Sequence, residues 1–244
     1  MTIEEFSSGF DTLLNSFAHT AQFGDATSPI DIVCNEYEKS VFLTKAQEEI
    51  ALGLYNGRNP LGESFEQTEE VRRYLSNLIE EAELSPIVTT NGKPLGVSSK
   101  SKFFTLPDNP PVWFITYEAV EVTGKACDNT EPLEVVPIKQ DEYHHLKKNP
   151  FRGVNDRRAL RLDLSDDNVE IISEYTVTKY YIRYLRRLNP IILSNLDDND
   201  IGGKTVATEC ELPDVLHQKI LERAVMMALQ SKGIGMTSQT RKED

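Results

Sequence analysis

The sequence contains few residues whose types and spacing suit chemistry, and the most promising are His144 and His145, which follow Asp141 and Glu142. With Lys147 nearby, such a set could perform general acid–base catalysis in a hydrolase. On a helix, however, adjacent side chains point about 100° apart, so the two imidazoles cannot hold one metal ion as an i, i+4 pair does. A solvated helix with one packed histidine is the simpler interpretation. Metal-dependent turnover that is lost on His144→Ala would be needed to support a hydrolase.

Other catalytic signatures are weaker still. Residues 202–205 (GGKT) look like the end of a phosphate loop, but the upstream glycine and the buried strand are missing. Neither serine nor cysteine lies in an elbow motif, and acidic residues are spread without a pair set apart by spacing. Cys34, Cys127 and Cys210 are distant and odd in number, so they indicate neither a disulfide framework nor a zinc site. We predict a protein that is not an enzyme, with no cofactor and no metal.

The elements that would position these residues begin with a helical segment, residues 1–83. Four helices are expected, each opened by a capping or N-terminal signal: at Thr2 with Glu5, at Ser28-Pro29, at Thr44 with Gln47, and at Ser64 with Gln67. The third ends near Gly57, and the fourth carries its apolar face through Ala82. Three phenylalanines on the first helix could dock on another subunit, but packing within their own lobe is the simpler account. Residues 1–83 hold sixteen acids and five bases, a net charge of −11.

Strand patterns dominate residues 84–212. Val112–Val122 reads as one long strand, Ala159–Leu164 and Val169–Ser173 as a hairpin, and Thr176–Leu188 as a further strand, while Asn91-Gly92 could close another hairpin. Pro213-Asp214 opens a last helix, residues 213–231, which should pack on the core. Residues 232–244 have too few apolar groups to fold alone and are expected to be a flexible tail or an inter-subunit arm. The order predicts an α+β fold with an antiparallel sheet.

Charge is distributed unevenly along this chain of net charge −13. Lys147 to Arg187 holds ten basic and six acidic residues, a charge of +4, so the rest carries −17. Arginine beside tyrosine, as in this segment, is typical of nucleic-acid binding and also of protein–protein hot spots. Because the acidic remainder would repel a polyanion, we favour a protein partner, and steep salt-dependent DNA binding would support the alternative. The expected interface residues are Arg152, Arg157, Arg158, Arg161, Tyr181, Arg183, Arg186, Arg187, Met236 and Arg241.

The acidic lobe of a second copy would be a natural partner for this basic face. Such head-to-tail association is the geometry that closes rings. The acidic N-terminus does not read as a signal peptide, and no run of about eighteen apolar residues predicts a membrane span. Synthesis in a cytoplasm, without a membrane partner, is therefore expected.

Several segments, in this order, resemble structural proteins of crAss-like bacteriophages: DEYHHLKKNPFRG, RRALRLDL, VEIIS, YYIRYLRRLNPIIL and TECELPDVLHQKILERAVMMAL. The likeness is to the ring proteins of the head-to-tail connector, and it covers residues 140–230 well and the helical part more loosely. The resemblance implies a virion protein made in the bacterial host, assembled as a dodecameric ring below the portal with genomic DNA passing through its lumen. An acidic lumen would suit that role, because DNA must slide without sticking. Residues 233–244 would then become ordered against a neighbouring subunit or the portal.

Overall fold

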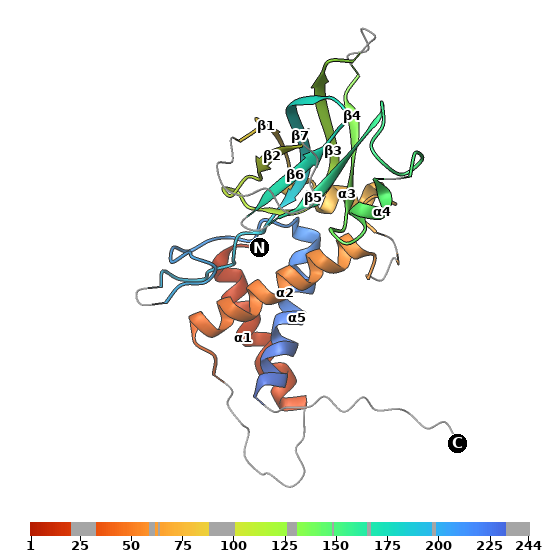
Figure 1. The fold of residues 1–244 in the computed structure, drawn as a ribbon. Helices are drawn as coiled ribbons and strands as arrows, with labels where there is room; N and C mark the ends of the chain where they lie inside the picture. Colours follow the sequence, from red (N-terminus) through yellow and green to blue (C-terminus); the bar gives the residue numbers. More distant parts are fainter. Residues whose placement is uncertain are drawn as a thin grey trace, which may run out of the picture. The chain divides into compact units, whose positions relative to one another are not determined.

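The protein divides into two compact units (Figure 1). The structure, a computed structural model, describes residues 1–20, 33–58, 62, 64–87, 101–125, 131–147, 149–164, 167–196 and 199–232. Unit 1 comprises Met1–Asn77 with Leu188–Asp244, and unit 2 comprises Leu78–Arg187. The expected boundaries at 83/84 and 212/213 differ from this division, because residues 79–84 form a strand of the sheet and residues 188–212 join the helices.

Unit 1 is built on three long helices, α1 (Ile3–Thr20), α2 (Glu36–Asn56) and α5 (Asp214–Ser231), with a short α3 (Glu69–Tyr74). The capping box that opens α1 is confirmed: the Thr2 N–H donates to Glu5 Oε2 at 2.8 Å, and the Glu5 N–H donates to Thr2 Oγ1 at 3.3 Å. The expected helix start at Thr44 is wrong, because α2 runs without interruption from its capping residue Asn35 to Gly57, whose φ is +74°. The expected start at Ser28-Pro29 lies outside the described residues.

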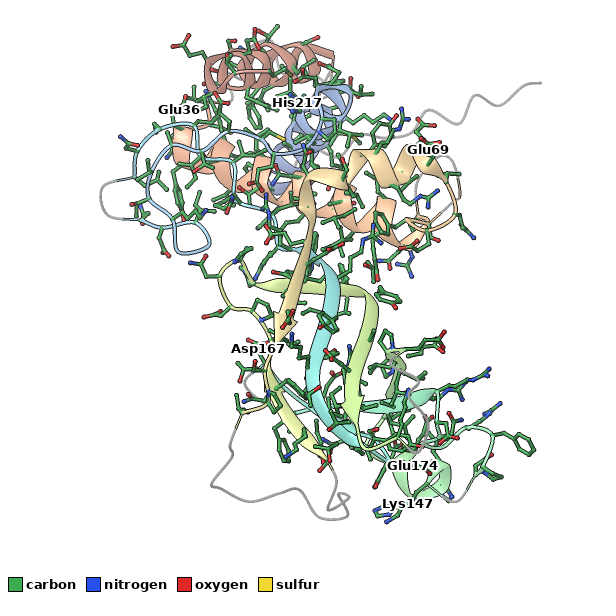
Figure 2. The ribbon with its side chains drawn as sticks, turned by 90° about the horizontal axis from the view of Figure 1, so that it is seen from above. Glu36, Glu69, Lys147, Asp167, Glu174 and His217 are labelled. Carbon is green, nitrogen blue, oxygen red and sulfur yellow. The ribbon has the colours of Figure 1, made fainter. Side chains whose placement is uncertain are left out.

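Apolar and polar contacts join the three helices of unit 1. Phe6 and Phe10 of α1 are buried, and the rings of Phe6 and His217 of α5 lie with centroids 5.2 Å apart. Two hydrogen bonds from the Arg223 guanidinium on α5 reach both carboxylate oxygens of Glu49 on α2, at 2.7 and 2.9 Å. Figure 2 labels one residue on each of two of these helices, Glu36 on α2 and His217 on α5. The last helix begins at Asp214, as predicted.

Side chains of α2 also hold the extended segment 189–193. The Ser40 hydroxyl accepts the Leu193 N–H at 3.0 Å, and the Thr44 hydroxyl accepts the Ile191 N–H at 3.1 Å. The Thr44 hydroxyl also lies 3.3 Å from the Ile191 carbonyl, to which it can donate. These hydroxyls lie four residues apart on one face of α2 and satisfy one edge of the segment, while Ile192 exchanges backbone hydrogen bonds with Thr208 on the other edge. This explains why residues 188–212 belong with the helices.

Unit 2 is a seven-stranded sheet in the order β1-β7-β3-β4-β5-β6-β2. Its strands are β1 (Ile79–Leu84), β2 (Lys102–Thr105), β3 (Val112–Thr123), β4 (Leu133–Ile138), β5 (Arg158–Asp163), β6 (Asn168–Ile172) and β7 (Thr176–Arg186). The α+β class and the β5–β6 hairpin are confirmed. The sheet is mixed, however, because β4 and β5 run parallel while the other five pairings are antiparallel.

The helix expected from Ser64 through Ala82 forms only in its middle, because residues 65–67 form a turn, α3 begins at Glu69, and residues 79–84 form a strand. In residues 79–84 (IEEAEL), apolar and acidic side chains also alternate in part, as in a strand. These residues form β1, which pairs with the second half of β7, from Ile79 opposite Leu185 to Leu84 opposite Tyr180. Ala82 and Leu84 pack against the core, while Glu81 and Glu83, which alternate with them, are exposed. Long-range pairing therefore overrides a helical spacing that local sequence alone favours.

The sheet curls so that its inner face encloses the core of unit 2. Phe104 on β2 and Tyr180 on β7 are far apart in strand order, yet their ring centroids lie 5.3 Å apart. Just beyond β1, the Ile87 N–H donates to the Phe103 carbonyl of β2 at 2.8 Å, which brings the two edges together. A second, smaller cluster covers the outer face of β5, where Leu160 packs with Tyr143 of α4 (Tyr143–Leu146).

Candidate assembly interface

The loop of residues 149–157 is held in shape by hydrogen bonds of the Asn149 side chain and backbone. The Asn149 Oδ1 accepts the N–H groups of Phe151 and Arg152 at 2.9 and 3.2 Å, and the Gly153 N–H donates to the Asn149 carbonyl at 2.7 Å. A Cβ at Gly153 would lie 2.7 Å from that carbonyl oxygen and 2.8 Å from the Leu146 carbonyl oxygen. Only glycine fits so close to the backbone. The turn is therefore set by sequence. Lys147, at the end of α4, marks where the chain enters it (Figure 2).

This loop presents a large apolar side chain to solvent. Phe151 is 85% exposed, although the Arg158 Nη1 donates to its carbonyl at 3.0 Å and Val154 packs on the outer cluster of β5. Arg152 and Arg157, in the same loop, are exposed and form no side-chain ion pair with another described residue. We call Phe151, Arg152 and Arg157 the Phe151 knob. An exposed aromatic ring in one loop with two unpaired guanidinium groups has the composition of a binding hot spot.

The basic face of β7 is largely neutralised by acids of its own sheet. Lys179 Nζ lies 2.7 Å from Glu83 of β1, and the Tyr181 hydroxyl donates to Glu121 of β3 at 3.1 Å. Arg183 is opposite Glu81 in the β1 register and makes no ion pair within the described chain. These contacts leave the tyrosine and lysine of β7 less able to bind phosphate, which weighs against the nucleic-acid alternative.

Arg161 lies inside unit 2 and so cannot form part of an exposed surface. Its Nη1 lies 2.5 Å from Glu118 Oε1, the Tyr180 hydroxyl donates to Glu118 Oε2 at 2.7 Å, and both charged side chains are at most 10% exposed. Burial raises the pKa of Glu118, although Arg161 and the Tyr180 hydroxyl oppose the shift. The sequence predicted Arg161 as an interface residue, on the face of β5 opposite Leu160. The curl turns that face toward the core instead, and α4 covers the opposite face, which carries Leu160.

The remaining predicted interface residues fall into three groups. Arg158 holds the knob loop, and Arg186, with a side chain 15% exposed, lies 3.2 Å from Glu80 of β1. Arg187 is exposed next to Arg186. Met236 and Arg241 lie outside the described residues. Arg152 and Arg157 are therefore exposed residues of one loop, whereas Arg158, Arg161 and Arg186 make contacts within their own unit.

Phe151 was not among the predicted interface residues. Its signal in the sequence is a lone aromatic in a polar turn, between Pro150 and Gly153, in an otherwise basic stretch. His144 and His145 are exposed on α4, and no group of three or more potential metal ligands occurs in the part of the chain that the structure describes. Within those same ranges, none of the helices has the length and apolar character needed to cross a membrane.

Charge separates between the two units. Counted on the whole sequence, unit 1 holds 22 acidic and 11 basic residues, a net charge of −11. Unit 2 holds 17 acidic and 15 basic residues, a net charge of −2. The acidity of the protein therefore resides mainly in the helical unit, and the exposed arginines of the Phe151 knob belong to the nearly neutral one.

Two proteins of Bacteroides phage crAss001 are similar to this chain over almost their full length. Ring protein 3 is 49% identical over 236 residues, which cover 95% of this chain and 96% of its own. Ring protein 4/5 is 32% identical over 238 residues, covering 93% and 92%. The chain is thus a structural ring protein of a crAss-like phage, as the resemblance implied. It belongs to the family described as phage tail ring protein 3/4, whose profile matches residues 1–240.

Proposed function

We propose that the protein is a non-enzymatic subunit of an oligomeric ring in the head-to-tail connector of the virion, next to the portal and other ring proteins. The observation that carries the proposal is the Phe151 knob: an 85% exposed aromatic ring in the same loop as two exposed arginines, on a turn fixed by Asn149 and Gly153. A partner that covers this ring gains the free energy of removing its apolar surface from water. Together with membership of a ring-protein family, it favours assembly as the function.

The charge division of the chain supports association of like subunits. A unit of net charge −11 and a separate surface with uncompensated arginines are complementary between copies. When two different surfaces of one subunit bind each other, the contact repeats from copy to copy and closes a ring if the rotation allows. We take the ring to be dodecameric, as the resemblance to connector rings implies.

Passage of DNA through the lumen is consistent with the overall charge of −13. DNA carries one negative charge per roughly 1.7 Å of helix axis, so a protein wall with few free cations binds it weakly. Weak binding is what a conduit needs, because each retained phosphate contact would slow the moving duplex. Residues 233–244 would contact the portal or a neighbouring subunit in this arrangement.

The test compares the full chain with the double variant Arg152→Glu and Arg157→Glu, alone and with the portal protein of the same phage. Wild-type chain should form rings, visible by negative-stain imaging and light scattering, and the variant should remain monomeric with an unchanged circular dichroism spectrum. Raising the ionic strength from about 0.1 M to about 1 M shortens the Debye length from about 10 Å to about 3 Å, so it should weaken the rings.

The matched control is Lys45→Glu with Arg72→Glu, which changes the net charge equally at two exposed positions of unit 1. This control should assemble normally. If purified virions lack the protein and the wild-type chain forms no rings with or without portal, the proposed function is rejected. If the variant of the knob forms rings as readily as the control, the knob is not an assembly surface.

A further inference from the structure

A shallow groove of about 680 Å³ runs between α1 and α5 in unit 1. Gly9 of α1 lines this groove where α1 meets α5, and a Cβ there would lie 2.9 Å from the Leu221 side chain. The two helices therefore approach closely there, and Leu13 and Leu221 contribute apolar surface to the groove beside the small side chain of Ser8. An aromatic side chain can lie on such a surface with little rearrangement.

The charged lining of this groove is mainly acidic. Glu5 is exposed, and the Asp214 side chain is 88% exposed although it lies 3.1 Å from the Met1 amine. The hydrogen bond from that amine holds the pKa of Asp214 below its usual range, so its carboxylate stays ionised in mildly acidic solution. The Met1 amine is the single cation among the described lining residues. The carboxylates of Glu5 and Asp214 outnumber the Met1 amine, so the net charge of the groove lining is negative.

A second groove, of about 520 Å³, lies between α2 and α5 and has the opposite charge. Its lining includes Arg58, Lys219 and Arg223, of which only Arg223 is paired, with Glu49. An incoming basic surface would be repelled from this groove and attracted to the first one. The charge of the lining therefore favours the α1–α5 groove over the α2–α5 groove as the site for a basic surface.

We infer that the Phe151 knob of one copy docks in the α1–α5 groove of the next copy, an inference that rests on the proposed ring assembly. Phe151 covers the apolar lining near Leu13 and Leu221, and Arg152 and Arg157 bind the carboxylates of the groove. Arginine and carboxylate form the strongest charge-assisted hydrogen bonds, often two at once. Each copy offers one knob and one groove, so the contact is head-to-tail and repeats around a ring.

Two single variants test the two halves of the contact. Phe151→Ser removes the exposed ring, and Thr12→Arg places a bulky cation in the groove at an exposed position of α1. Each should weaken assembly on the order of 30-fold or more, the scale of a hot-spot residue, without altering thermal unfolding. The matched controls are Val206→Ser, another exposed apolar residue, and Asn56→Arg in the α2–α5 groove. Both controls should assemble like wild type.

Mixing the two variants tests that the contact joins different copies. A Phe151→Ser chain retains its groove and a Thr12→Arg chain retains its knob, so the mixture should form one-to-one dimers that cannot extend. Each variant alone should stay monomeric. A mixture that stays monomeric overturns the pairing of knob and groove, as does normal ring formation by either variant alone.

Photo-crosslinking in the assembled particle tests the contact directly. The photoreactive residue p-benzoyl-phenylalanine replaces Phe151 and, as a control, Val206. Illumination should link position 151 to peptides containing residues 5–13 or 214–221 of another copy, identified by mass spectrometry. Links to a different region or protein, or none above the control, overturn this inference while ring membership stands. Particles in which wild-type chain is absent would instead remove the proposed function itself.

Discussion

Arg161→Met is the substitution that best separates an arginine of the fold from an arginine of the interface. Methionine preserves much of the apolar stem of Arg161 but removes its guanidinium, which lies 2.5 Å from Glu118 inside the curled sheet. Glu118 would remain buried with the Tyr180 hydroxyl as its one described donor. The substitution therefore tests the free energy of one buried ion pair and leaves the exposed knob untouched.

The expected magnitude follows from the exposure of the two acids that contact Arg161. Asp163 lies 3.0 Å from Nε but is 68% exposed, so that pair contributes at most about 1 kcal/mol. Glu118 is 8% exposed, and removing one partner of a buried pair costs about 3–5 kcal/mol, because the other charge is left without its counter-ion. We expect the free energy of unfolding of unit 2 to fall by about that amount.

The loss should depend on pH in a defined direction. Burial raises the pKa of Glu118 in the folded protein, and without Arg161 nothing but the Tyr180 hydroxyl opposes that shift. A carboxyl group with a raised folded pKa keeps its full contribution to stability below the unfolded pKa, near 4.3 for glutamate, and loses it as the pH rises through the folded pKa. Arg161→Met should therefore destabilise the protein less near pH 4 than near pH 7.

Urea unfolding followed by tryptophan fluorescence measures this directly, because Trp113, the one tryptophan of the chain, lies on β3 of unit 2. With a slope of about 2 kcal/mol per M, the midpoint should fall by about 1.5–2.5 M. Adding Glu118→Gln removes the stranded charge and should recover most of the loss. Arg157→Met, at an exposed position, should stay within about 0.5 kcal/mol of wild type. An Arg161→Met chain as stable as Arg157→Met but unable to assemble would refute the reasoning.

Two further predictions concern unit 1, whose unfolding is followed by the helical circular dichroism signal. Thr44→Val removes the hydroxyl that holds Ile191 and should cost about 1–3 kcal/mol, whereas Thr44→Ser should retain most of the stability; equal effects of the two would contradict the proposed hydrogen bonds. Lys39→Met removes an amine that binds Asp11 at 2.7 Å and Glu36 at 2.9 Å. Because both acids are at least 42% exposed and can be rehydrated, the loss should be about 1–2 kcal/mol, and a loss as large as that of Arg161→Met would be inconsistent with this account.

The sequence predicted elements well where local signals decide them. The Thr2 capping box, the end of α2 at Gly57 and the β5–β6 hairpin each depend on residues close in sequence, and all are confirmed. Thr44 shows where such reasoning fails. A threonine followed three residues later by glutamine looks like a helix start, but its hydroxyl serves a segment some 147 residues away. No local pattern carries that information.

The sequence predicted the basic composition of the candidate site, but not which of its arginines are exposed and unpaired. The segment around Arg152 stands out as basic from sequence alone, and it does contain the exposed arginines. Which arginines are free depends on their sheet neighbours: Glu118 neutralises Arg161, and Glu80 lies beside Arg186. Both acids precede their arginines by more than forty residues, and pairing of distant strands brings them together.

Some of these arginines stabilise the fold and others are free to bind a partner, and the difference has a physical basis. An arginine whose acidic partner lies in its own chain has its charge already satisfied there, and its removal destabilises the fold, as expected for Arg161. An arginine on a rigid turn with no partner of its own, such as Arg152, remains available at no cost to folding. A ring subunit needs both kinds, because it must be stable before it assembles and must retain unsatisfied surface until a neighbour covers it. Phe151 meets the same requirement for apolar surface: its turn is held by Asn149 and Arg158, so folding alone leaves its ring in water.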